Sequence, residues 1–185
     1  MKNLLTVIFL HGISIGMNAQ ILPLNEFGKV EYTEVVKIDS TTQNLLFSSA
    51  QKWFVETFKN AKDVIQVENR ENGEIIGKGT FHIQTNRFGY SAIGLGVVRF
   101  QVQVDVKDGR YKYSFSNFIH VGDKPQIYDC GCLDDEKPDA CSKKIFAEVK
   151  EKTDVQIKLL IESLKISMNR NAGKKSDWWF DKIWR

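Results

Sequence analysis

The sequence predicts an α+β fold, in which an antiparallel sheet carries two helices on one face in the order β-α-β4-α. Three observations predict it: a strand followed by an amphipathic helix, a central run of alternating strands, and a long second amphipathic helix. Strands joined by short turns pair antiparallel, and helices outside such a run pack together on one side. The other face of the sheet is then expected to be open to solvent.

The first strand and helix follow a short entry segment. Val30–Ile38 is rich in Val, Tyr and Thr, which is typical of a strand. Ser40 followed by Gln43 matches a capping box, in which each side chain bonds a free backbone N–H at a helix start. Apolar residues then recur at helical spacing and predict a helix that ends near Lys59; they are Leu46, Ala50, Trp53, Phe54 and Phe58.

Four further strands are predicted next. Val64–Glu68 and Ile75–Gln84 flank an Asn72-Gly73 turn, and a looser glycine-bearing stretch covers Thr85–Gly96. The last two strands alternate strictly around Asp108-Gly109, a dipeptide that favours a type I′ hairpin turn. A two-residue turn predicts one apolar face that runs through Ile119, and these pairs: Val106 with Tyr111, Val104 with Tyr113, Val102 with Phe115 and, on the other face, Asp105 with Lys112.

A polar segment and a second helix complete the domain. Residues 122–141 contain two prolines and all three cysteines and are expected to form an irregular loop. A helix is predicted from Ser142 to Met168. Its apolar stripe consists of Phe146, Val149, Thr153, Ile157, Leu160 and Leu164.

Composition and charge limit the function. The chain has 185 residues, 42% of them hydrophobic, with 26 Lys and Arg against 23 Asp and Glu. These values are ordinary for a globular protein and exclude collagen-like, low-complexity and wholly disordered chains. A net charge of +3 gives no electrostatic indication of nucleic-acid binding, so no nucleic acid is expected as a partner.

The N-terminus has the features of a secretory signal peptide, which we assign to residues 1–19. Lys2 supplies a positive charge, Leu4–Ile15 is apolar, and Ala19 is a small residue before the expected cut. The apolar stretch is shorter than the ~18–20 residues that a transmembrane helix needs. We expect export to the periplasm or beyond, with no transmembrane span after leader removal; a retained N-terminal anchor is the alternative.

Short stretches of residues between Val30 and Val121 suggest a family. They are Lys-Trp-Phe at 52–54, Ala-Lys-Asp-Val-Ile-Gln at 61–66, Gly-Glu-Ile-Ile-Gly-Lys-Gly at 73–79 and Lys-Asp-Gly-Arg-Tyr at 107–111. With these stretches the chain resembles a family of uncharacterised secreted bacterial domains with a TBP-like fold. The resemblance implies a β-α-β4-α layout. Because no interior boundary is visible, we expect residues 20–175 to form a single domain of this type. The resemblance implies no activity, and the name of the fold refers to shape rather than to DNA binding.

The three cysteines are the most distinctive local cluster. Cysteines of exported proteins tend to pair, and a bridge within Cys130-Gly131-Cys132 is strained. A disulfide from Cys141 to Cys130 or to Cys132 is therefore expected, with the third thiol left over. The alternative is a cysteine-centred redox or metal-binding protein, with zinc held by the three thiolates and His120 or Asp129.

Catalytic residues are not apparent. His82 and His120 are the only histidines after the leader, and neither belongs to a recognisable grouping with Ser, Cys or Asp. The sequence assigns no catalytic residue, cofactor or metal ligand, and an enzyme is not expected.

Two surfaces are candidates for binding. The segment 176–185 is dense in aromatic residues: Trp178, Trp179, Phe180 and Trp184. It is expected to fold back on the domain, with docking to a partner protein or to a membrane interface as the alternatives. The open sheet face offers amide, hydroxyl and charged groups to a peptide or glycan of the envelope, unless it is merely solvated: Arg99, Gln101, Gln103, Lys112 and Ser114. The sequence thus favours a non-enzymatic exported binding or envelope-associated module.

Overall fold

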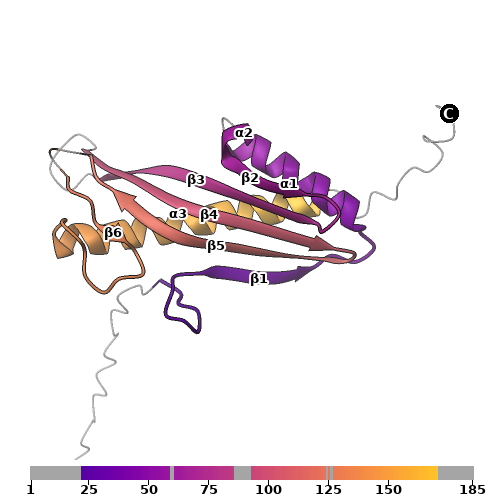
Figure 1. Ribbon diagram of the computed structural model, residues 1–185, viewed down its shortest axis with the longest axis horizontal. Coiled ribbons are helices and arrows are strands. Elements are labelled where there is room, and N and C mark those ends of the chain that lie inside the picture. Colours follow the sequence, from indigo (N-terminus) through magenta and orange to yellow (C-terminus); the bar gives the residue numbers. More distant parts are fainter. Residues whose placement is uncertain (1–21, 59–60, 86–92, 124, 126, 171–185) are drawn as a thin grey trace, which may run out of the picture.

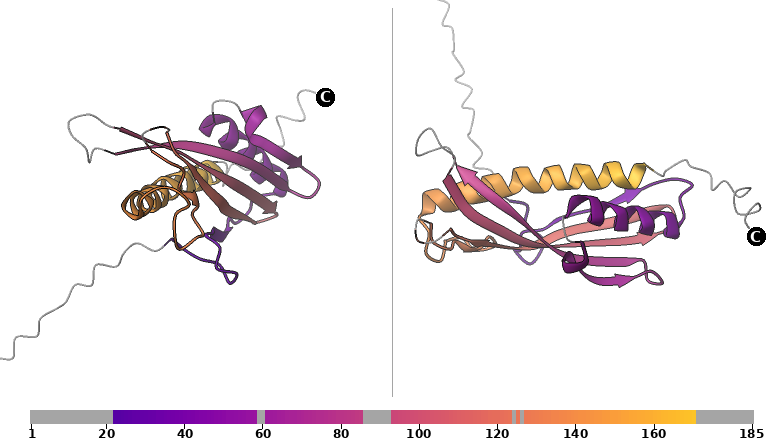
Figure 2. Two further views of the ribbon diagram at one scale, coloured as in Figure 1. Left: turned by 60° about the vertical axis from the view of Figure 1, so that its left-hand side comes forward. Right: turned by 90° about the horizontal axis from the view of Figure 1, so that it is seen from above.

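The computed structural model describes residues 22–58, 61–85, 93–123, 125 and 127–170. Within these ranges, a six-stranded antiparallel sheet forms one layer, and the two long helices lie together against one of its faces (Figures 1 and 2). The α+β class is therefore as predicted. We call the face that carries the helices the inner face and the opposite one the outer face.

The elements follow the chain as β1 (Tyr32–Lys37), α1 (Gln43–Thr57), α2 (Ala61–Val64), β2 (Ile65–Asn69), β3 (Glu74–Thr85), β4 (Ile93–Lys107), β5 (Arg110–Val121), β6 (Gly131–Cys132) and α3 (Lys143–Asn169). The strand order is β1-β5-β4-β3-β2, and β6 pairs with β5. The predicted layout lacked the single-turn α2 and the two-residue β6, which lies within the expected loop 122–141. It also began β4 too late, because Ile93–Gly96 is already strand.

The β4–β5 hairpin has the predicted register. All four predicted pairs are present, including Asp105 opposite Lys112. The turn, however, is not type I′, because Gly109 alone of its two central residues has a positive φ, of 72°. Asp108 has a Cβ, which disfavours a positive φ. Its Oδ1 accepts the backbone N–H of Gln43 at 2.6 Å, which fastens the hairpin tip to the start of α1.

The start of α1 also differs from the prediction. Thr42, not Ser40, is the N-cap, and its side chain accepts the N–H of Leu45. The side chain of Gln43 is engaged elsewhere, since Nε2 donates to the carbonyl oxygens of Arg70 and Glu71. The predicted capping box is thus replaced by bonds that join α1 to its two neighbouring turns.

A β-bulge reverses the alternation of β5 near its end. The register against β4 shifts between Arg99 and Gln101, and Asn117 takes a positive φ of 57°. Beyond the bulge Phe118 and His120 point into the core, while Ile119 is 46% exposed on the outer face. The prediction that Ile119 shares the apolar face of Tyr111 was therefore wrong.

The core lies between the inner face and the two long helices. Trp53 of α1 is 2% exposed and makes edge-to-face contacts with Phe54, Phe58 and Phe115. Ser142 caps α3, and the predicted stripe of α3 is buried except for the partly buried Leu160. Among the described helices, none is long and apolar enough to cross a membrane.

Candidate functional site

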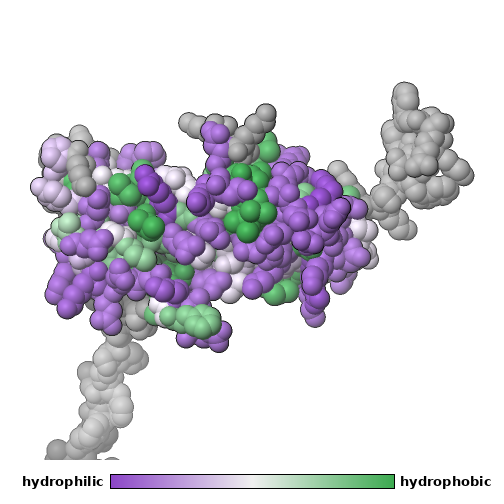
Figure 3. All heavy atoms as spheres, viewed as in Figure 1, coloured by the Kyte–Doolittle hydropathy of each residue, from purple (hydrophilic) through white to green (hydrophobic). Residues whose placement is uncertain are grey.

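The five residues predicted to offer a binding face do share one side of the sheet. Gln103 lies opposite Ser114. Arg99 and Gln101 alternate with the buried Val98, Phe100 and Val102 and therefore point away from α3. Lys112 is on the same side, because it neighbours Ser114 at a spacing of two. The outer face is the side turned toward the viewer in Figure 3, where it is mostly hydrophilic with small, separate apolar patches.

The amides and hydroxyls of this face already have partners. Gln103 Nε2 donates to Glu74 at 3.2 Å and to Asp105 at 3.0 Å. Ser114 Oγ donates to Glu31 Oε1 at 2.7 Å, and this bond is the largest cause of the lowered pKa of Glu31. Gln103 and Ser114 are thus engaged within the protein, and a ligand on the middle of the outer face would have to compete with these bonds.

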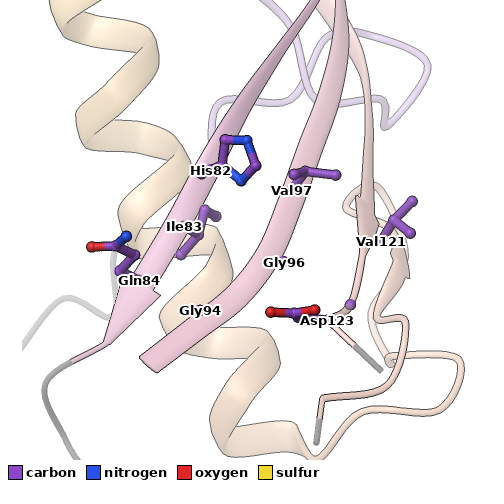
Figure 4. A pocket seen from close by; sticks show the side chains of 9 residues that line it. His82, Ile83, Gln84, Gly94, Gly96, Val97, Val121 and Asp123 are labelled. Atoms are coloured by element: carbon purple, nitrogen blue, oxygen red, sulfur yellow. The ribbon is translucent and has the colours of Figure 1, made fainter. Parts of the chain in front are cut away.

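A pocket lies at one end of the outer face, and we call it the sheet-end pocket (Figure 4). Its volume is about 200 Å³, and His82, Gln84, Gly94, Gly96, Val121 and Asp123 line it. His82, Val97 and Val121 are paired in register across β3, β4 and β5, so their side chains share one face. That face is the outer one, because the next residues, Val98 and His120, are buried.

Two glycines of β4 create the hollow. Gly94 and Gly96 have no side chain, and that of Leu95 between them is buried, so the strand adds no side chain to the pocket at these three positions. Gly96 has a φ of 109°, and a Cβ there would overlap the carbonyl oxygen of Val121. A Cβ on Gly94 would lie 3.1 Å from Asp123 Oδ2. Glycine within a strand often marks a place where a ligand or another backbone comes close.

Three polar side chains border this glycine floor. Among the described residues, none of His82, Gln84 and Asp123 has a side-chain hydrogen bond or ion pair, in contrast to Gln103 and Ser114. Together they offer an imidazole, an amide and a carboxylate, which supply both donors and acceptors. The sequence did not predict this site, because His82 belongs to no recognisable grouping and Thr85–Gly96 has only a loose pattern. The available signal was the pair of glycines that interrupts the alternation of β4.

His120 is a structural residue. It is wholly buried, with Nε2 2.8 Å from the carbonyl oxygen of Leu95, and Nδ1 accepts the backbone N–H of Cys130 at 3.1 Å. Since the partner of Nδ1 is a donor, we assign the proton of the neutral ring to Nε2. Burial lowers the pKa of His120. The two ring nitrogens thus join the start of β4 to the residue that precedes β6.

The cysteines form one disulfide, between Cys130 and Cys141, and Cys132 is free. This is one of the two pairings expected from the sequence. Burial raises the pKa of the Cys132 thiol, which disfavours the reactive thiolate. The zinc alternative needs the two sulfurs that this bond consumes. In the described part of the chain, no group of three or more His, Cys, Asp or Glu side chains is placed to hold a metal ion.

The aromatic segment that contains Trp178, Trp179, Phe180 and Trp184 lies outside the described residues, as does the leader.

An antiparallel sheet with two helices on its inner face and an open outer face defines an α+β domain of TBP-like shape. Solved structures share it. A DUF4468 family protein from Bacteroides ovatus ATCC 8483 is similar with a TM-score of 0.60 and 17% identity, over 85% of this chain and 95% of that one. A TBP-like protein from Parabacteroides distasonis ATCC 8503 is similar with a TM-score of 0.56 and 15% identity, over 79% of this chain and 98% of that one.

The family model described as "domain of unknown function (DUF4468) with TBP-like fold" matches residues 32–120. The resemblance to this family that the sequence suggests is therefore confirmed over residues 32–120. A comparison with curated proteins finds no match.

Proposed function

We propose that the protein is an exported, non-enzymatic binding module of the cell envelope that holds one neutral glycan unit in the sheet-end pocket. The observation that carries the proposal is a set of polar side chains around a floor of glycine, His82, Gln84 and Asp123, which have no side-chain partner among the described residues. The pocket is small compared with the ~300–1,000 Å³ of sites for drug-sized ligands. It therefore suits a single terminal unit of a longer chain.

The chemistry of the pocket favours a sugar. Sugar hydroxyls can donate to the carboxylate of Asp123 and can both donate to and accept from Gln84 and His82. Val97 and Val121 add an apolar wall for the C–H groups of a sugar ring. An extended peptide more often adds a strand to a sheet edge, and this pocket lies on a face between paired strands.

Export is the second part of the proposal. The apolar leader at residues 1–19 supports it, and so does the Cys130–Cys141 disulfide, because such bonds persist in oxidising compartments. N-terminal sequencing of the protein from the extracytoplasmic fraction should begin at Gln20. Recovery of intact Met1 from that fraction would contradict cleavage at this site.

Binding is tested by titrating the isotope-labelled protein with neutral oligosaccharides of hexose and N-acetylhexosamine and following backbone amide signals by NMR. The amides of Gly94, Gly96 and Asp123 should shift, with saturation. Asp123→Asn should weaken binding roughly tenfold, as expected when a bond to a charged acceptor is lost. Gly94→Ala should weaken it by narrowing the floor.

The matched control is Lys78→Ala, an exposed residue on β3 away from the pocket. It should bind as the unaltered protein does. Absence of shifts at the glycines with every sugar would overturn the proposal. Shifts caused instead by peptides, and located along β1 or β2, would indicate a peptide-binding edge.

A further inference from the structure

The long helix α3 has an apolar stripe on its solvent side, opposite the stripe that packs on the sheet. Val155, Leu159 and Ile166 are 49%, 60% and 61% exposed. At ~100° per residue their spacings of four and seven place them on one face of the helix. We call this face, together with Glu151 and Glu162, the outer stripe of α3. A segment or partner that docked along this row would bury three aliphatic side chains at once.

The acidic residues of the outer stripe have no ion-pair partner within the part of the chain that the structure describes. Among the described residues, neither Glu151 nor Glu162 has an ion-pair partner, although both are exposed. Neighbouring lysines of α3 are committed elsewhere: Lys158 pairs with Asp154 at 2.7 Å, and Lys165 pairs with Glu34 at 2.8 Å. The outer stripe is therefore apolar with net negative charge.

The chain beyond α3 is complementary to this stripe. Residues 171–185 contain four basic residues against two acidic ones. Their apolar side chains lie within seven consecutive positions: Trp178, Trp179, Phe180, Ile183 and Trp184. The segment 176–185 thus supplies large aromatic groups for the aliphatic residues. It is itself neutral, with Lys182 and Arg185 against Asp177 and Asp181, and the net positive charge comes from Lys174 and Lys175 in the connection just before it.

The connection is long enough. At a rise of ~1.5 Å per residue, Leu159 lies roughly 15 Å before the end of α3. The seven residues 171–177, at up to ~3.3 Å each, span roughly 23 Å and include Gly173. The aromatic segment can therefore turn back and reach the stripe within its own chain, at a high effective concentration.

We propose that residues 176–185 dock on the outer stripe of α3. The segment then covers an exposed helix face of its own domain, and the three tryptophans are removed from water together with Leu159 and Ile166. This docking does not depend on the sheet-end pocket, which lies on the opposite face of the sheet.

The test is a comparison of stabilities in the purified protein with and without residues 176–185. Leu159→Glu with Ile166→Glu should lower the urea midpoint of the full chain and leave that of the truncated chain unchanged, because the substitutions act only through docking. Val55→Glu is the matched control: Val55 is 63% exposed on α1, outside the stripe, and should act equally in both chains.

Tryptophan fluorescence gives an independent readout. Trp53 is buried and contributes little to acrylamide quenching, so a rise in quenching reports on the three C-terminal tryptophans. The Leu159 and Ile166 substitutions should increase quenching and red-shift the emission, whereas Val55→Glu should not.

Equal effects of the stripe substitutions in the full and truncated chains, with unchanged quenching, would overturn the proposal. A dimer in sedimentation experiments that the Leu159 substitution dissociates would assign the stripe to a second copy instead. Co-sedimentation of the full chain, but not the truncated one, with phosphatidylethanolamine–phosphatidylglycerol vesicles, without the stability difference, would assign the segment to a membrane surface.

Discussion

Tyr32 and Asp154 are 122 residues apart in the chain, and the hydroxyl of Tyr32 donates a 2.9 Å hydrogen bond to Oδ1 of Asp154. Both residues are buried, at 8% and 3% exposure. Burial, with the neighbouring carboxylate, raises the pKa of Tyr32 far above its ordinary value, so the phenol remains a donor. The bond joins the edge strand β1 to the helix α3, which are distant in sequence.

Loss of this bond should be measurable. Tyr32→Phe should reduce the free energy of unfolding by about 1–3 kcal/mol, because a buried charged acceptor then loses one partner. Tyr128→Phe is the control, since Tyr128 is 56% exposed, and it should have almost no effect. Urea melts of the three proteins decide the matter; equal midpoints for Tyr32→Phe and the parent would mean that the bond contributes nothing.

Truncation of Trp53 should be far more costly. Its ring contacts three phenylalanines, and Nε1 donates to Ser163 Oγ at 2.8 Å, which links α1 to α3. Trp53→Ala should therefore reduce the free energy of unfolding by about 3–5 kcal/mol. Ser163→Ala removes only the hydrogen bond and should cost about 1 kcal/mol. A loss below ~1 kcal/mol for Trp53→Ala would show that the core is not assembled around this residue.

The sequence predicted those parts of the fold that depend on local alternation. The β4–β5 register followed from the apolar pattern and a two-residue turn. The pattern failed at Ile119, because a bulge changes which residues of β5 face the core. The burial of Phe118 and His120 in the structure shows this change. The N-cap prediction failed for a similar reason: long-range bonds from Asp108 and Gln43 determine how α1 begins.

The candidate site was less predictable than the fold. The outer face could be deduced from alternation, but whether Gln103 and Ser114 are available depends on Glu74 and Glu31, which come from other strands. The pocket needs β3, β4 and the residue after β5 to meet in space. The spacing of the cysteines limited the partner of Cys141 to Cys130 or Cys132. Which of the two pairs with it depends on β6 lying beside β5, a contact that the sequence does not show.

The buried His120 should make stability depend on pH. Its pKa in the folded protein is lowered from an ordinary value of 6.5, so the unfolded chain binds the proton first as pH falls. The free energy of unfolding should therefore be highest above pH 6.5 and decline below it. His120→Gln should flatten this decline, while the exposed His82→Gln should retain it. Denaturant melts from pH 8 to 5 test this, and an unchanged slope in His120→Gln would contradict it.

The disulfide should be detectable in the native protein by its effect on thiol counts. One thiol, that of Cys132, should react with Ellman's reagent, and slowly because its pKa is raised. Three should react after reduction and unfolding. Replacing Cys130 and Cys141 together with Ala should cost about 2–4 kcal/mol, as expected for closure of a short loop. Three fast-reacting thiols in the native protein would favour the redox alternative instead.

The two glycines of the sheet-end pocket should respond differently to alanine. Gly96 has a positive φ and a neighbouring carbonyl oxygen, that of Val121, where a Cβ would stand. Gly96→Ala should thus cost at least about 1–3 kcal/mol in backbone strain alone.

Gly94 has no such φ, and its Cβ would meet only the end of the exposed Asp123 side chain, which can move. Gly94→Ala should therefore keep stability within ~1 kcal/mol and yet narrow the pocket. Melts of both variants, with binding measured on Gly94→Ala, separate the two roles. Equal destabilisation by the two substitutions would mean that both glycines are required by the backbone conformation of β4. The pocket would then be only a consequence of that conformation.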